Sequence, residues 1–232
     1  MLSLTLTPVN RAEVLRYMGF GRETPDDAFL TRIDTCEKQL LQQVRPHFIY
    51  RVERLTRNTD AALSAGSLIL QGQSIAEHLE GCTHVIFMAA TLSIQADRLI
   101  AQAQTRDLTD ALILEALANA GIEQICDKAE QIIREKFPEQ YFTWRFSPGY
   151  GDLPLEIQGA LLGLLDAPRK IGLTATETSI LIPRKSVTAL IGVSDSPLPK
   201  KRRGCIACTM RERCLYRNKG VHCSHVESAS EE

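Results

Sequence analysis

The stretch Arg145-Phe-Ser-Pro-Gly-Tyr150 places a permanent cation, a Pro-Gly pair and a phenol within six residues. A Pro-Gly pair favours a type II turn, because glycine adopts positive φ without strain from a Cβ atom. Such a turn brings backbone donors and acceptors close to Arg145 and Tyr150. The Arg145 guanidinium is suited to bind a ligand carboxylate, since it matches two oxygens at once. Alternatively, the stretch is a strand that ends in an ordinary turn, with Arg145 on the surface.

A second pattern follows at Gly172-Leu-Thr-Ala-Thr-Glu-Thr-Ser-Ile-Leu-Ile-Pro183-Arg-Lys-Ser186-Val187, after an apolar segment over residues 155–165. Together the two patterns resemble the activation domain of cobalamin-dependent methionine synthase. That family carries an Arg-x-x-x-Gly-Tyr motif, then a Leu-Thr-x-Ser-like strand and a Pro-x-x-Ser-Val segment. The order and spacing of the motifs agree, and the resemblance extends over about residues 108–193.

The order of predicted elements is mixed. Helices are expected at residues 11–18, 25–44, 94–104, 108–137 and 155–165, the fourth kinked or broken near Gly121. Strands are expected at residues 2–6, 48–55, 67–70, 85–90, 142–146, 180–183 and 187–193. Helices among strands that do not alternate with them favour the α+β class over a doubly wound sheet. The resemblance implies the same class, a bent antiparallel sheet flanked by helices.

The resemblance also implies a binding site for S-adenosylmethionine. By position, Arg145 would bind the carboxylate of the ligand, and Glu139, six residues earlier, would contact its ammonium or sulfonium end. Glu123 matches a second family glutamate on the preceding helix, and Ser147 and Gly149 belong to the turn beside the ligand. One arginine and two carboxylates complement this ligand, because a sulfonium cannot donate a hydrogen bond and is stabilised by nearby negative charge.

Tyr150 has a separate, catalytic role in the resemblance. The family tyrosine reaches toward the cobalamin face, where a phenol can hydrogen-bond a water near cobalt or shape the open coordination site. Alternatively, Tyr150 packs on Pro148 or Pro154 within the turn. For the two glutamates the alternative is a surface charge at a helix end for Glu139 and a solvated helix residue for Glu123.

The chain departs from the family in ways that bear on its partners. No tyrosine follows in residues 194–199, where longer members supply an adenosyl contact, and the acidic ligand contact of the family's N-terminal portion has no secure counterpart. The cobalamin signature Asp-x-His-x-x-Gly is absent, since no histidine has an aspartate two residues before it. The resemblance therefore implies a free-standing activation subunit that meets a cobalamin-binding methyltransferase module in trans.

The implied reaction is the rescue of oxidised cobalamin. An external donor supplies one electron to cob(II)alamin, and the resulting cob(I)alamin takes the methyl group of S-adenosylmethionine to give methylcobalamin. The activation subunit supplies proximity and orientation, and irreversible methyl transfer draws the unfavourable reduction forward. The cofactor carries out the difficult chemistry.

Composition excludes several other classes. The chain has 232 residues, 44% of them hydrophobic, and a formal net charge of −1, which describes an ordinary globular protein with room for a core. The absence of overall basicity gives no reason to expect a nucleic-acid partner. No apolar run reaches the roughly 18 residues of a membrane span, and the start lacks the pattern of a signal peptide. We expect a cytoplasmic protein.

The seven cysteines fall into two groups. Three are scattered through apolar or helical surroundings and are expected to be small buried side chains: Cys36, Cys82 and Cys126. Four fall in the last 28 residues and have the spacing of a metal site, either zinc or an iron–sulfur cluster: Cys205, Cys208, Cys214 and Cys223. Alternatively, the second group is a reduced, disordered segment.

The cysteine segment suggests how the chain is divided. Residues 1–193 are expected to form the S-adenosylmethionine-binding activation domain, and residues 194–204 a polar linker with four consecutive cations. Residues 205–226 would be a short cysteine-rich hook that holds a metal, and residues 227–232 a disordered acidic tail.

The sequence therefore predicts an accessory subunit that binds S-adenosylmethionine and reactivates a cobalamin-dependent methyltransferase, most readily methionine synthase. An alternative is an iron–sulfur electron-transfer protein for a corrinoid protein, in which the cysteines are the active part. A third interpretation is a non-catalytic interaction subunit. A conventional methyltransferase is disfavoured, because no Gly-x-Gly-x-x-Gly loop follows a strand.

Overall fold

A computed structural model describes residues 2–20, 25–57, 63–199 and 213 of the chain. It divides into one unit over Met1–Pro197 and a second over Leu198–Glu232. The helices of the first unit are α1 (Arg11–Tyr17), α2 (Asp27–Gln43), α3 (Gln73–His78), α4 (Ile94–Gln104), α5 (Leu108–Lys136), α6 (Ile157–Leu165) and α7 (Ala167–Ile171). Its strands are β1 (Leu2–Ser3), β2 (His47–Arg57), β3 (Leu63–Ala65), β4 (Leu68–Leu70), β5 (His84–Thr91), β6 (Tyr141–Phe142), β7 (Thr174–Ala175), β8 (Leu181–Ile182) and β9 (Ser186–Ser194).

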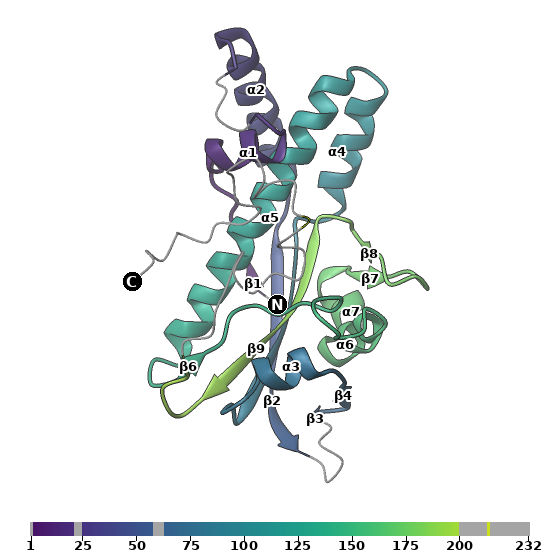
Figure 1. Ribbon diagram of the computed structural model, residues 1–232. Coiled ribbons are helices and arrows are strands. Elements are labelled where there is room, and N and C mark those ends of the chain that lie inside the picture. Colours follow the sequence, from purple (N-terminus) through teal and green to yellow (C-terminus); the bar gives the residue numbers. More distant parts are fainter. Residues whose placement is uncertain (1, 21–24, 58–62, 200–212, 214–232) are drawn as a thin grey trace. The chain divides into compact units, whose positions relative to one another are not determined.

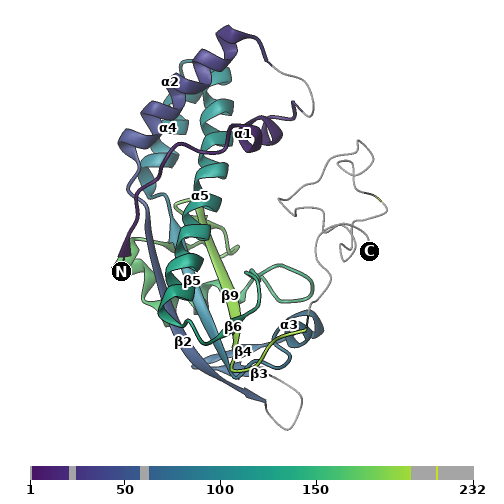
Figure 2. The same cartoon turned by 90° about the vertical axis from the view of Figure 1, so that its left-hand side faces the viewer.

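The main sheet is antiparallel, with the strand order β4-β3-β2-β5-β9-β6 and with β1 also paired to β2. The long strand β2 pairs with β5 over His47–Arg54 and with β3 over Leu55–Arg57. It therefore joins two parts of the sheet, and Figure 2 shows its curvature. The predicted α+β class, a bent antiparallel sheet flanked by helices, is confirmed.

Two hydrophobic cores lie on opposite faces of this sheet. Because side chains alternate along a strand, Ile86 and Met88 of β5 enter one core while Val85 and Phe87 enter the other. The first core is closed by α1, α2, α4 and α5. The second is closed by β3, β4, α3, α6 and α7. Figure 1 shows α6 and α7 apart from the long helix α5, in agreement with these two groups.

Between the end of β6 and an isolated bridge at Phe146, the chain has one residue more than the facing part of β9. Phe142 pairs with Val193, and Phe146 forms a bridge with Leu190, so four steps along one strand oppose three along the other. This count defines a β-bulge, which redirects side chains. Phe142 accordingly packs against the first core, whereas Phe146 lies in the second. The predicted strand over residues 142–146 therefore forms only in part: Phe142 belongs to β6, Phe146 forms an isolated bridge, and residues 143–145 between them are not strand.

Most predicted helices agree with the structure to within about two residues, and α4 has the expected bounds. The expected break near Gly121 is wrong, because α5 is continuous from Leu108 to Lys136. Gly121 is instead a point of close packing: a Cβ atom there would lie 3.3 Å from Leu6 and 3.5 Å from Leu92. The short elements α3, α7 and β3 were not predicted, whereas β7 lies where the resemblance implies a Leu-Thr-x-Ser-like strand.

Cys36, Cys82 and Cys126 are buried and have free thiols, as expected. The cysteine-rich segment, the basic part of the linker and the acidic tail lie outside the described residues, so their roles stay predictions. Of the helices that the structure describes, none combines the length and apolar character needed to cross a membrane.

Gly192 tests the packing between β9 and the elements beside it. A Cβ atom there would lie 2.5 Å from the Cys82 sulfur and 2.9 Å from Leu79. We expect Gly192→Ala to lower the free energy of unfolding by about 1–3 kcal/mol, because the strand or the neighbouring side chains must shift to relieve this overlap. The matched control is Gly163→Ala on α6, where a Cβ atom meets nothing within 4 Å. Urea unfolding of both variants measures the difference, and equal stability would contradict the packing described.

Candidate functional site

The predicted Pro-Gly turn is present. The Tyr150 backbone N–H donates to the Ser147 carbonyl at 3.0 Å, and Gly149 has φ +86° at the third position of the turn. Pro148 at the second position and a positive φ at the third are the features of a type II turn. Ser147 is half-buried, whereas Gly149 and Tyr150 are exposed. The turn therefore presents its glycine and its phenol to solvent.

The loop beyond this turn is held against the start of α3. Asp152 accepts hydrogen bonds from the backbone N–H groups of Gln73 at 2.6 Å and Ser74 at 2.9 Å. These two donors lie in the first turn of α3, where helix N–H groups otherwise lack partners. A Cβ atom on Gly151 would overlap the Ser74 side chain. The loop consequently has a defined position on the protein surface.

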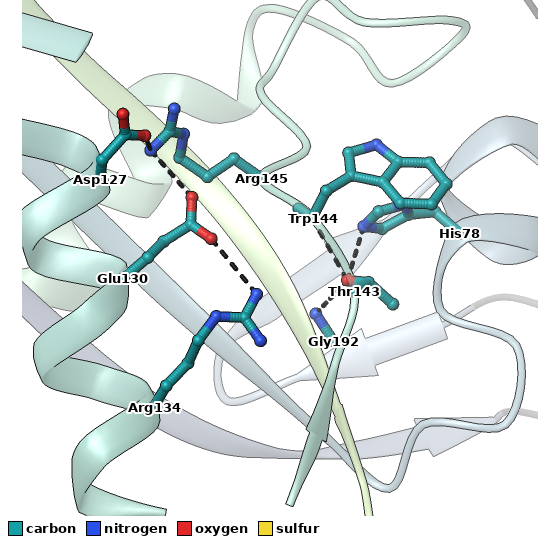
Figure 3. A network of polar contacts seen from close by, with 8 residues as sticks. All are labelled: His78, Asp127, Glu130, Arg134, Thr143, Trp144, Arg145 and Gly192. Carbon is teal, nitrogen blue, oxygen red and sulfur yellow. Dashed lines mark hydrogen bonds and ion pairs between the residues drawn. The ribbon is translucent and has the colours of Figure 1, made fainter. Parts of the chain in front are cut away.

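Three carboxylates of α5 surround the guanidinium of Arg145. Its Nη2 lies 2.9 Å from Glu123, and its Nη1 lies 2.9 Å from Asp127 and 2.8 Å from Glu130. Glu130 also lies 3.4 Å from Arg134 (Figure 3). Residues 123, 127 and 130 fall on one face of the helix, because their spacing is four and three residues. Five charged groups thus form one cluster, which we call the Arg145 cluster.

The surroundings of Glu123 raise the pKa of its carboxyl group. Burial raises its pKa, and the neighbouring charge of Arg145 lowers it in part. The negative charges of Asp127 and Glu130 raise the pKa further. A carboxylate in this environment gains from any positive charge placed beside it. The cluster therefore favours a cationic group near Glu123.

Helix α1 brings an aromatic ring to the same region. Burial and the charge of Glu123 both raise the pKa of Tyr17. The Arg16 guanidinium lies over the Tyr17 ring, 4.3 Å from its centroid, and is itself paired with Glu13 at 2.6 Å. The helix begins at an Asn10 cap, whose side chain accepts from the Ala12 N–H at 2.9 Å. The cap and helix were predicted, but no signal in the sequence placed Tyr17 near Glu123.

A buried polar network lies on the other side of the bulge (Figure 3). The Thr143 hydroxyl accepts a hydrogen bond from the Gly192 N–H at 2.7 Å and lies 2.8 Å from the His78 Nε2 atom. The His78 ring contacts Trp144 and Phe146, with centroids 4.7 and 4.8 Å apart. These contacts fix the backbone on both sides of Arg145. They give its side chain a rigid base.

The structure brings together only some of the predicted site residues. Arg145 and Glu123 form an ion pair, and Ser147, Gly149 and Tyr150 follow in the adjoining turn. Glu139 lies in an exposed turn after α5 and does not join the Arg145 cluster. Tyr150 is 58% exposed, and its ring packs against that of Phe146, with the centroids 5.9 Å apart.

Asp127, Glu130 and Arg134 were missed by sequence reasoning. The sequence could have indicated them, because they follow Glu123 at helical spacing in a segment that was predicted to be a helix and so share its face. The four C-terminal cysteines lie outside the described residues. Within the part of the chain that is described, no group of three or more histidine, cysteine or acidic side chains could hold a metal ion.

No protein-family model matches the chain, and no curated protein matches it. Among solved structures, the fold is similar to that of the MetH reactivation domain bound to AdoHcy, with a TM-score of 0.67 and 12% sequence identity. The similarity covers 95% of this chain and 85% of that domain. The chain therefore has the α+β fold of a reactivation domain. The resemblance to the methionine synthase activation domain is confirmed at the level of the fold.

Asp152 makes the position of the loop dependent on pH. Hydrogen bonds from the backbone of Gln73 and Ser74 lower the pKa of Asp152 below its usual 3.8. Its contribution to stability is therefore present above pH 3.8 and lost as the pH falls through the lower folded-state pKa. We expect Asp152→Asn to lower the melting temperature at pH 7, because the substitution removes the negative charge and replaces one of the two accepting oxygens by an NH2 group, which only donates.

The difference in melting temperature between wild type and Asp152→Asn should shrink below pH 3.8. Glu177→Gln, an exposed residue in the turn between β7 and β8, is the control that removes one negative charge without this contact. A difference that stayed constant down to pH 2 would show that the carboxylate charge does not hold the loop.

Proposed function

We propose that this chain binds S-adenosylmethionine at Arg145 and the adjoining turn, and that it supports reductive methylation of cob(II)alamin on a cobalamin-dependent methyltransferase in trans. The observation that carries the proposal is the Arg145–Glu123 ion pair beside the Ser147–Tyr150 turn. It occurs within a fold shared with a domain whose solved structure contains AdoHcy. Methionine synthase is the partner that this combination favours most.

The charges of the Arg145 cluster support this ligand. Three carboxylates of α5 approach one guanidinium, and Arg134 contacts only one of them. The cluster therefore holds an excess of one negative charge when Arg134 is included. S-adenosylmethionine carries two positive groups and one carboxylate, so its net charge is of the opposite sign. Arg145 offers directional donors for the carboxylate, and Glu123 offers a negative charge for a cation.

The exposed turn supports the second part of the proposal. Tyr150 and Gly149 face solvent beside Arg145, so a methyl group held here could be reached by the cobalamin of another protein. The cobalamin supplies the nucleophile and an external donor the electron. This chain would bind the methyl donor, orient it and present Tyr150 at the edge of the site. Glu139, in its exposed turn, would supply a second negative charge for the cationic end of the ligand.

The C-terminal cysteines remain a separate prediction. Cys205, Cys208, Cys214 and Cys223 have the spacing of zinc or iron–sulfur ligands. Zinc would make the segment a structural element, and an iron–sulfur cluster would make it a route for the electron. Neither role is needed for the binding of S-adenosylmethionine by the first unit.

Arg145 tests the binding part of the proposal. We expect Arg145→Ala to weaken S-adenosylmethionine binding by about a hundredfold, because the ligand carboxylate loses a charge-assisted, bidentate partner. Arg145→Lys keeps the charge but not the planar fork, and should weaken binding by about tenfold. Calorimetric titration of anaerobically purified protein measures both effects. Arg169→Ala on α7, where the side chain is 76% exposed, is the matched control.

Unaltered affinity in Arg145→Ala would contradict the assigned site, provided that its melting temperature shows a folded protein. If the wild-type chain alone binds no ligand, the titration is repeated with a cobalamin-binding methyltransferase module present. Absence of binding in that complex would contradict the proposed function itself.

Tyr150 tests the catalytic part. We expect Tyr150→Phe to leave S-adenosylmethionine affinity unchanged and to slow methylation of partner-bound cob(II)alamin by about tenfold, the scale of a lost polar contact at a reacting centre. The visible spectrum of the cobalamin follows the reaction under a constant electron supply. Tyr141→Phe, an exposed tyrosine on β6, is the control. An equal rate in wild type and Tyr150→Phe would assign Tyr150 no part in the reaction.

A further inference from the structure

The three carboxylates of the Arg145 cluster differ in their exposure to solvent. The exposed fraction of the side chain is 19% for Glu130, 49% for Glu123 and 71% for Asp127, against 20% for Arg145. Glu130 and Arg145 are thus the enclosed pair of the cluster. Asp127 is the member most open to solvent.

Glu130 and Asp127 also differ in their contacts with residues other than Arg145. Glu130 lies 3.4 Å from Arg134, whose guanidinium stacks over the Phe142 ring at 4.9 Å. Arg134 therefore restrains the Glu130 side chain through a contact that does not involve Arg145. Asp127 pairs with Arg145 alone among the described residues. It can therefore leave Arg145 without breaking a second contact.

We propose that Glu130 is the positioning residue for Arg145, and that Asp127 competes with the ligand carboxylate for the same guanidinium. The inference rests on the proposed function and adds to it two residues with opposite effects. Glu130 would keep the guanidinium oriented toward the site. Asp127 would occupy Nη1 of Arg145 until a ligand carboxylate replaces it.

The need for replacement follows from the donors of Arg145. Asp127 at 2.9 Å and Glu130 at 2.8 Å both contact Nη1, which has two hydrogens, and Glu123 contacts Nη2 at 2.9 Å. A ligand carboxylate that binds both terminal nitrogens at once needs a hydrogen of Nη1, and it must therefore displace Asp127 or Glu130. A carboxylate that approached through Nε would still bring a fourth negative charge to one guanidinium. In both cases the ligand carboxylate and the Asp127 carboxylate compete for the same guanidinium.

Displacement costs least at Asp127. An exposed carboxylate returns to water and loses an ion pair worth little in solvent. Displacement of Glu130 would instead leave two partly buried charges without each other, which costs considerably more. The ligand is therefore expected to exchange with Asp127 while Glu130 stays in place. Asp127 should weaken the binding of a carboxylate and strengthen the binding of a cation.

The first experiment compares two ligands on Asp127→Asn. S-adenosylmethionine should bind about two- to fivefold more tightly to the variant, because its carboxylate no longer competes with an exposed ion pair. Decarboxylated S-adenosylmethionine keeps the sulfonium and the ammonium but has no carboxylate. It should bind more weakly to the variant, since one attractive negative charge has been removed. Unchanged or weaker binding of S-adenosylmethionine would overturn the competition.

The matched variant is Glu130→Gln, which removes a negative charge from the next turn of the same helix. Long-range attraction alone would give the two variants the same effect. We expect Glu130→Gln to weaken S-adenosylmethionine binding by about tenfold, because Arg145 loses the charged partner that orients it. Equal changes in affinity for Asp127→Asn and Glu130→Gln would overturn the division of roles.

A third measurement needs no ligand. The side-chain nitrogen signals of Arg145 in NMR spectra report rotation of its guanidinium. Glu130→Gln should speed this rotation strongly, whereas Asp127→Asn should change it little. The reverse order, or equal effects, would overturn the assignment of Glu130 whatever the ligand is. Failure of S-adenosylmethionine to bind wild type, with the expected NMR result, would instead overturn the proposed function and the competition by Asp127, and would leave Glu130 as the positioning residue of Arg145.

Discussion

The fold depends on a pair of central strands that are buried on both faces. β5 pairs with β9 along its whole length, and alternate side chains of β5 enter the two hydrophobic cores. Buried polar groups are costly unless they are hydrogen-bonded, so such strands leave little room for charged side chains. A site built from charged side chains must then lie outside these central strands, where the chain leaves the sheet. The Arg145 cluster lies at such a place, between the edge strand β6 and helix α5.

One extra residue in the edge strand determines which way Arg145 points. Without the bulge, Phe142 and Phe146 would face the same side, because side chains alternate with a period of two. The bulge sends Phe146 into the second core and leaves Arg145 facing α5. Thr143 holds the bulge through its hydroxyl contacts with Gly192 and His78. The orientation of the charged site thus depends on a buried polar contact behind it.

The parts of this arrangement that local chemistry determines could be predicted from the sequence. A Pro-Gly pair specifies its turn, and Asn10 specifies the start of a helix, because both effects act within a few residues. The bulge could not be predicted, since it depends on the register between β6 and a strand 50 residues further on. Gly121 suggested a broken helix, although its small size serves packing against Leu6 and Leu92. The helical spacing of the acidic residues on α5 could be recognised in the sequence, but only the tertiary structure shows that they pair with Arg145.

The Arg145 cluster also illustrates a conflict between stability and binding. A guanidinium that is four-fifths enclosed needs negative partners, because burial of an unpaired charge is costly. Under the proposed function, those partners are the same groups that a ligand carboxylate would have to displace or tolerate. A fully enclosed set of acids would stabilise Arg145 and exclude the ligand. A fully exposed set would leave the guanidinium poorly oriented. One enclosed acid and one exposed acid satisfy both demands, since the first fixes the geometry and the second can leave at little cost.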